Sequence, residues 1–135
     1  MRRAIEPFRG FWALPAGYQE IDEQPHETVV REVREESGLE VAVSGLLDLI
    51  FVSDDPRRPA NVAVFLCREI GGTLRPGEEE SEARWFSLNA LPARIGFDNY
   101  SRILGRLLAS DGYPESAWSL LRELLRSERG GREDA

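Results

Sequence analysis

Residues 17–39 read GYQEIDEQPHETVVREVREESGL, and the second half of this stretch carries the clearest helix signal in the chain. Three valines recur at helical spacing after Pro25, whose missing N–H is harmless in a first helical turn. Gly38 suits the position just past the last turn, because glycine tolerates the left-handed backbone conformation. The stretch therefore predicts a helix over residues 25–37, anchored to a sheet through its valines.

Three glutamates of this helix are spaced so that they can act together on one ligand. Glu32, Glu35 and Glu36 follow an i, i+3, i+4 pattern and so share one helix face. Like charges at this spacing repel by roughly a few tenths of a kcal/mol per pair, and a bound divalent cation would turn that repulsion into attraction. Mg²⁺ prefers carboxylate oxygens and usually also takes phosphates and water. Taken alone, the acids fit a solvated helix face better than a metal site, with Arg31 paired to Glu27 or Glu35.

The complete pattern around these acids resembles the signature of the Nudix hydrolases. That signature is a glycine, five residues, a glutamate, seven residues and then Arg-Glu-apolar-x-Glu-Glu-x-Gly-apolar. The chain matches it at every defined position, with Gly17, Glu23, Arg31, Glu32, Val33, Glu35, Glu36, Gly38 and Leu39. The lead-in Trp12-Ala13-Leu14-Pro15-Ala16-Gly17 is also similar to this family, and the resemblance covers about residues 2–110.

The resemblance implies an enzyme that cleaves a nucleoside diphosphate linked to another group, with Mg²⁺ or Mn²⁺ and water. Glu35 and Glu36 match the main metal ligands, and Glu32 matches a residue that binds metal or helps to activate water. These three glutamates are the expected catalytic residues. The carbonyl of Ala16, beside Gly17, is expected as an extra metal ligand.

The other signature residues are expected to shape the site. By the resemblance, Glu23 and Arg31 form an architectural pair that ties the loop to the helix, and Gly17 and Gly38 are structural residues of the motif. A later loop often completes such sites with one more acid.

In this chain that loop is the acidic stretch at residues 75–82, which offers four glutamates. Glu79 is the expected metal ligand, from its position before Trp85. A solvated acidic turn is an equally good interpretation for any single one of them.

Outside the signature, the residues predict four strands and two further helices. Runs of β-branched and aromatic residues, bounded by Pro and Gly, place these elements. The strands are expected at residues 11–14, 40–53, 61–70 and 83–88, and the helices at 98–109 and 114–126. Because strands and helices do not alternate strictly, the pattern indicates an α+β or α/β/α layered domain.

The resemblance refines this fold class to α+β of the Nudix type, an α/β/α sandwich with a mixed sheet. Only about ten residues precede Trp12, so one or more N-terminal strands of the family are expected to be missing. Such a short form would leave a sheet edge open to a second chain, which makes a homodimer one expected assembly. The expected division is a Nudix domain over 1–110, a helical extension packed on it over 111–129, and a disordered tail over 130–135.

The amino-acid composition argues against several classes of binding partner. The chain has 135 residues with 17 basic and 24 acidic ones, a net charge of −7, which disfavours nucleic acid and anionic membranes. One cysteine excludes an internal disulfide, and no apolar run approaches the roughly 20 residues of a membrane span. With no apolar leader at its start, the chain is expected to be a cytoplasmic protein that binds a small nucleotide.

The substrate itself is left open by the signature, because the residues that recognise base and sugar lie outside it. ADP-ribose, a dinucleotide cofactor and a nucleoside triphosphate are the expected classes, and the lead-in around Pro15 looks more like members that cleave nucleoside diphosphate–X compounds. Trp12, Trp85 and Tyr100 can stack on a base, although packing is the commoner use of such residues. The alternative is a catalytically weak or inactive module that binds or senses a nucleotide, and the complete set of glutamates favours the enzyme.

Overall fold

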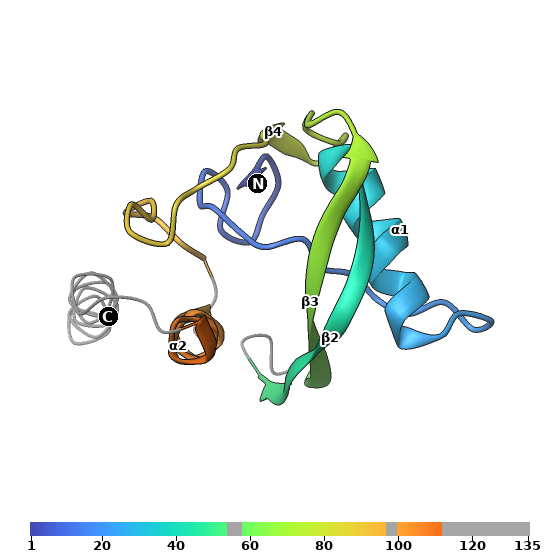
Figure 1. Ribbon diagram of the computed structural model, residues 1–135. Coiled ribbons are helices and arrows are strands. Elements are labelled where there is room, and N and C mark those ends of the chain that lie inside the picture. Colours follow the sequence, from blue (N-terminus) through green and yellow to red (C-terminus); the bar gives the residue numbers. More distant parts are fainter. Residues whose placement is uncertain (54–57, 97–99, 112–135) are drawn as a thin grey trace.

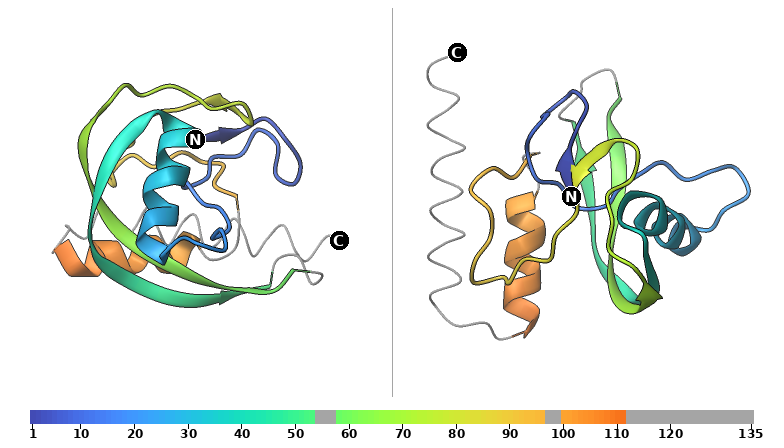
Figure 2. Two further views of the ribbon diagram at one scale, coloured as in Figure 1. Left: turned by 90° about the vertical axis from the view of Figure 1, so that its right-hand side faces the viewer. Right: turned by 90° about the horizontal axis from the view of Figure 1, so that it is seen from above.

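The computed structural model describes residues 1–53, 58–96 and 100–111 (Figure 1). The elements follow the order β1 (Arg2–Arg3), α1 (Pro25–Ser37), β2 (Leu39–Val52), β3 (Ala60–Gly72), β4 (Glu80–Glu82) and α2 (Tyr100–Asp111). The long β2–β3 hairpin lies in the middle, with α1 on one side and the N-terminal segment and α2 on the other (Figures 1 and 2). This is the layered α+β arrangement expected from the sequence.

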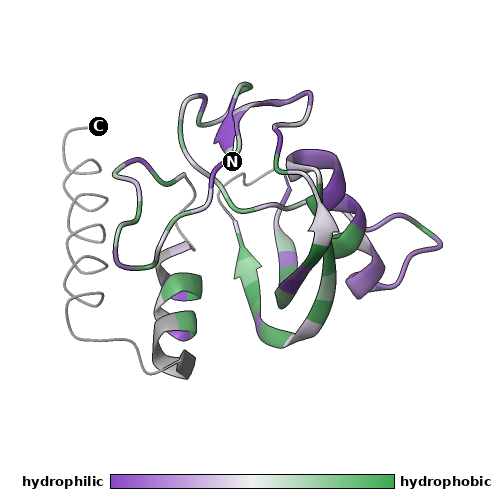
Figure 3. Cartoon of the chain, turned by 45° about the horizontal axis from the view of Figure 1, so that its top comes forward, coloured by the Kyte–Doolittle hydropathy of each residue, from purple (hydrophilic) through white to green (hydrophobic). Residues whose placement is uncertain are grey.

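The hairpin forms because both runs are rich in β-branched and aromatic residues. It is antiparallel, and its register runs from Leu39 opposite Gly72 to Val52 opposite Ala60. Three register shifts in β2 interrupt the ladder, and such bulges bend and twist a strand. The hairpin therefore curves around the centre of the molecule, and its hydrophobic residues form the green band in Figure 3.

Helix α1 has the bounds predicted from the sequence. Its N-terminus is closed by a capping box, in which the Gln24 N–H donates to Glu27 Oε2 at 3.3 Å. Its C-terminus ends at Gly38, whose φ of 74° lies in the left-handed region and whose N–H donates to the Arg34 carbonyl at 2.9 Å. The helix leads directly into β2, so the acidic face of α1 keeps a fixed position relative to the sheet.

Helix α2 is attached to the other side of the hairpin. Its Ile103 and Leu104 are each 7% exposed and belong to the core. Asp48 of β2 accepts a hydrogen bond from Arg102 at 3.1 Å, and Arg106 Nε lies 3.9 Å from the same carboxylate. The Arg102 hydrogen bond lowers the pKa of Asp48, so this ion pair fastens the helix to the sheet while the apolar residues pack beneath it.

Two strand predictions were wrong. Residues 83–88 form no strand; the ladder near them is β4, which pairs with β1. Their Phe86 ring instead packs edge-to-face on Trp12, with centroids 4.8 Å apart. Trp12 itself makes only isolated bridges, one antiparallel to Arg2 and one parallel to Ile95, with its N–H donating to the Arg94 carbonyl at 2.7 Å. These main-chain bonds hold the segment without continuing into a ladder.

Several sequence predictions lie outside the described residues. They include the helix at 114–126, most of the extension at 111–129 and the tail at 130–135. The predicted helix at 98–109 is confirmed from Tyr100 onward as α2. Within the described part of the chain, no helix is long and apolar enough to cross a lipid bilayer.

Candidate active site

The loop before α1 lies along the acidic face of the helix and contacts it residue by residue. The Ala16 N–H donates to Glu36 Oε2 at 2.9 Å. The next residue, Gly17, lies so close to Glu32 that a Cβ atom at this position would overlap the carboxylate of that glutamate. The signature glycine is thus required here by a close approach, and the loop holds two of the predicted catalytic glutamates in place.

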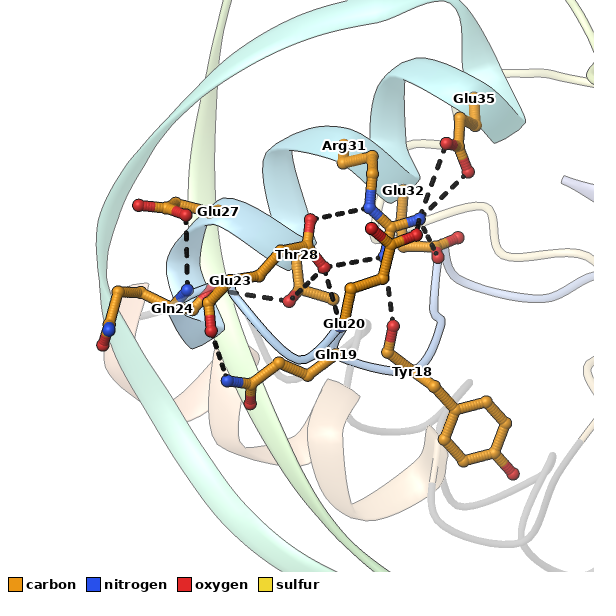
Figure 4. Close-up of polar contacts among 10 residues, drawn as sticks. All are labelled: Tyr18, Gln19, Glu20, Glu23, Gln24, Glu27, Thr28, Arg31, Glu32 and Glu35. Atoms are coloured by element: carbon orange, nitrogen blue, oxygen red, sulfur yellow. Dashed lines mark hydrogen bonds and ion pairs between the residues drawn. The ribbon is translucent and has the colours of Figure 1, made fainter.

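Arg31 continues this contact and joins the loop to the helix (Figure 4). Its Nε and Nη2 donate to the two carboxylate oxygens of Glu23 at 2.7 and 2.9 Å. Nη2 also donates to the Tyr18 carbonyl at 3.0 Å, and Nη1 donates to Glu32 at 2.8 Å and to Glu35 at 3.3 Å. One guanidinium therefore sets the relative positions of the loop backbone and three carboxylates.

Glu23 is the best-satisfied carboxylate of the site. Besides Arg31, it accepts hydrogen bonds from the Glu20 N–H at 2.9 Å and from Thr28 Oγ1 at 3.2 Å. The Arg31 hydrogen bond, followed by that from Glu20, lowers the pKa of Glu23 to about 2. Glu23 therefore stays ionised and closes the loop onto the first turn of the helix.

Glu36 lies in an environment that favours its protonated form, in contrast to Glu23. Burial raises the pKa of Glu36 to about 8, against the hydrogen bond from the Ala16 N–H, which lowers it. The charges of Glu32 and Glu80 raise this pKa further, and the α-amino group of Met1 lowers it slightly. Burial also raises the pKa of Glu32, against the effect of its Arg31 hydrogen bond. Among the described residues Glu36 has no arginine partner, so nothing offsets the effect of burial as strongly as Arg31 does for Glu23.

Of the four glutamates that the sequence offers in the loop at residues 75–82, Glu80 is the one whose charge acts on Glu36, whereas the sequence analysis favoured Glu79. Gly77 packs against the last turn of α1, where its N–H donates to the Glu36 carbonyl at 3.1 Å. A Cβ atom on Gly77 would lie 2.6 Å from Glu80 Oε2, so the Glu80 carboxylate lies over this glycine. The side chain of Glu79, the predicted ligand, is exposed. The structure thus brings Glu80 toward Glu36 and leaves Glu79 at the surface.

The donor chemistry of this cluster fits a divalent cation. Glu32, Glu36 and Glu80 offer carboxylate oxygens that Mg²⁺ and Mn²⁺ accept, and burial raises the pKa of each of the three. As the side chains lie, no three acidic, histidine or cysteine residues of the described segments surround a common point. Arg31 Nη1 instead holds the carboxylates of Glu32 and Glu35, at 2.8 and 3.3 Å.

The raised pKa of Glu36 predicts an unusual pH dependence of stability. In EDTA, folded Glu36 keeps its proton up to about pH 8, whereas in the unfolded chain it ionises near its usual value of 4.5. The folded state then binds more protons between these values, so the free energy of unfolding falls as the pH rises through this window. Differential scanning fluorimetry should show Tm decreasing from pH 5 to pH 8.

The matched variant for this experiment is Glu36→Gln, which cannot titrate and should show a flatter Tm profile than wild type. Glu69→Gln removes an exposed acid from β3 and should keep the wild-type slope. Equal slopes for wild type and Glu36→Gln would contradict the assignment of the effect to this carboxyl group.

Comparison with known proteins identifies the family. A family model described as the NUDIX domain matches residues 1–106, and the chain therefore belongs to the Nudix family. The resemblance seen in the signature is confirmed, and so is the fold class, because solved Nudix hydrolases share this architecture.

Several known Nudix proteins are similar to this chain in sequence or in structure. ADP-ribose pyrophosphatase of Methanocaldococcus jannaschii is 42% identical over 100 residues, covering 73% of this chain and 59% of that protein. NAD-capped RNA hydrolase NudC of Pseudomonas aeruginosa is 40% identical over 84 residues, covering 62% and 29% respectively. A crystal structure of a Nudix hydrolase from Nitrosomonas europaea has a TM-score of 0.70 at 28% identity, covering 84% and 64%. The chain spans less than two thirds of each of these proteins.

Proposed function

We propose that this protein hydrolyses the pyrophosphate bond of a nucleoside diphosphate linked to a further group, with ADP-ribose as the first substrate class to test. The observation that carries the proposal is the signature loop held onto the acidic face of α1, where the Ala16 N–H contacts Glu36 and Gly17 lies against Glu32. A diphosphate is itself anionic, so such an acidic face suits it only with a cation between the two. The ADP-ribose pyrophosphatase among the relatives supports the substrate class.

In this proposal Glu32, Glu35 and Glu36 hold Mg²⁺ or Mn²⁺, with Glu80 and the carbonyl of Ala16 as further donors. The ion supplies positive charge that offsets the diphosphate and makes a nearby water easier to deprotonate. Glu32 is the residue placed to take that proton, because Gly17 and Arg31 fix its carboxylate.

The remaining residues position these groups. Arg31 orients Glu32 and Glu35 while Glu23 holds the guanidinium from the other side. The Ala16 N–H does the same for Glu36. Such fixed donors and acceptors reduce the reorganisation that the reaction requires.

The test is a turnover screen in Mg²⁺ and in Mn²⁺ over ADP-ribose, NADH, FAD, diadenosine polyphosphates, deoxynucleoside triphosphates and an NAD-capped RNA. We expect the highest kcat/KM with ADP-ribose and loss of activity in EDTA. Preference for the capped RNA would refute the prediction that the partner is a small nucleotide, which rests on the net charge of −7. No turnover of any substrate, with nucleotide binding retained, would favour the sensing module instead. A cytoplasmic location and a homodimer stay predictions.

The role of Glu80 has its own test in metal binding. Glu80→Gln is expected to weaken Mn²⁺ binding at least about tenfold, because it removes a half-buried carboxylate that faces Glu36. Glu79→Gln is the matched control, since it changes the adjacent exposed glutamate by the same atoms. Isothermal titration calorimetry with Mn²⁺ alone measures both, and a larger loss in Glu79→Gln would restore the original sequence prediction.

A further inference from the structure

Tyr18 is an aromatic residue whose backbone is fixed and whose ring is not used by the fold. Its carbonyl accepts a hydrogen bond from Arg31 Nη2 at 3.0 Å, and its neighbour Gly17 is pressed against Glu32. The side chain is 68% exposed and forms no hydrogen bond or ring contact with the described residues. In Figure 4 the ring points away from the ion pairs drawn around Arg31.

The loop that carries Tyr18 is internally braced. Gln19 Nε2 donates to the Glu23 carbonyl at 2.5 Å, and the Glu23 N–H donates to the Glu20 carbonyl at 3.1 Å. Together with the Arg31 contacts, these bonds hold the loop at both ends of residues 18–23. The ring is therefore presented from a preorganised backbone, and little further order is lost when a planar ligand binds to it.

Tyr18 follows directly on the residue that touches Glu32. Consecutive Cα atoms lie about 3.8 Å apart, so the Tyr18 side chain begins one residue from the point where Gly17 meets Glu32. In a nucleotide, one ribose separates the phosphates from the base. An exposed ring that starts one residue from this contact is therefore a candidate contact for the base rather than for the phosphates.

We propose that the ring of Tyr18 is the surface on which the base of the nucleotide substrate stacks, which makes Tyr18 a specificity-determining residue. The inference rests on the proposed function for the position of the phosphates. Stacking uses the face of the ring and tolerates any base, so it favours nucleotides over base-free diphosphates. The phenol hydroxyl is not required.

The experiment compares ADP with inorganic pyrophosphate, each titrated calorimetrically in Mg²⁺ into wild type, Tyr18→Leu and Tyr18→Phe. Tyr18→Leu is expected to weaken ADP binding at least about fivefold, the low end of base–aromatic stacking. It should leave pyrophosphate binding unchanged, and Tyr18→Phe should behave as wild type. Ile21→Ala, which shortens a fully exposed apolar residue of the same loop, is the matched control and should change neither.

Kinetics with ADP-ribose give a second readout. Tyr18→Leu should raise KM with little change in kcat, because stacking holds the substrate equally before and during the reaction. Equal losses for ADP and pyrophosphate, or a loss in Tyr18→Phe as large as in Tyr18→Leu, would overturn the proposal. So would wild type binding ADP no more tightly than pyrophosphate. If wild type binds ADP as expected but turns over no substrate, the proposed function fails and the stacking inference stands.

Discussion

Replacing Glu36 with glutamine is expected to lower kcat at least about 100-fold, which corresponds to about 2.7 kcal/mol of transition-state stabilisation. Glu36 is the most buried of the three glutamates near the signature loop and faces Glu32 and Glu80, and in the proposed function its carboxylate is one of the ligands of the cation. A neutral amide contributes no negative charge. The measurement is steady-state turnover of the best substrate from the screen.

The variant should fold normally, because the amide oxygen of glutamine can still accept the hydrogen bond from the Ala16 N–H. Circular dichroism and Tm in EDTA check this. Glu27→Gln, a change of an exposed acid in the first turn of the same helix, should keep the kcat of wild type. Full turnover by Glu36→Gln would remove Glu36 from the catalytic machinery.

The second large effect is expected from Gly17→Ala, a change of one methyl group. The new Cβ would overlap the carboxylate of Glu32, which is the free end of a flexible side chain and can move aside. We therefore expect the protein to fold while Glu32 leaves its position. A displacement of about 1 Å can cost about 100-fold in rate, and we expect kcat to fall by that order.

The matched control is Gly45→Ala in β2, where a Cβ atom would meet nothing within 4 Å. It should have wild-type kcat. The double variant Gly17→Ala/Glu32→Gln should be no slower than Glu32→Gln alone, because both changes remove the same interaction. Additive losses would mean that Gly17 acts by some other route than the position of Glu32.

The elements that could be predicted from the sequence are those whose signals are local. The bounds of α1 follow from valine periodicity, a proline in the first turn and Gly38 after the last. The β2 and β3 runs are long and rich in strand-forming residues. Residues 83–88 also contain aromatic strand formers, but Phe86 packs on the Trp12 ring, and such a long-range side-chain contact leaves no periodic pattern in the sequence.

In the candidate site, too, some residues could be predicted from local sequence signals and others could not. Within the signature, spacing on one helix places Glu32, Glu36 and Arg31 near each other. The acid from the later loop depends instead on register, because adjacent residues of an extended segment point to opposite sides. Gly77 packing on α1 and the pairing of β4 with β1 decide that Glu80 turns inward, and neither contact is visible in the run of glutamates.

The loop contacts α1 through main-chain hydrogen bonds at residues 16 and 18. At residue 17 the absence of a side chain leaves room for the carboxylate of Glu32. The side chains of residues 16 and 18 can therefore change without breaking the attachment, whereas any side chain at residue 17 displaces Glu32. A change of substrate preference through the Tyr18 ring would thus leave the placement of the glutamates untouched.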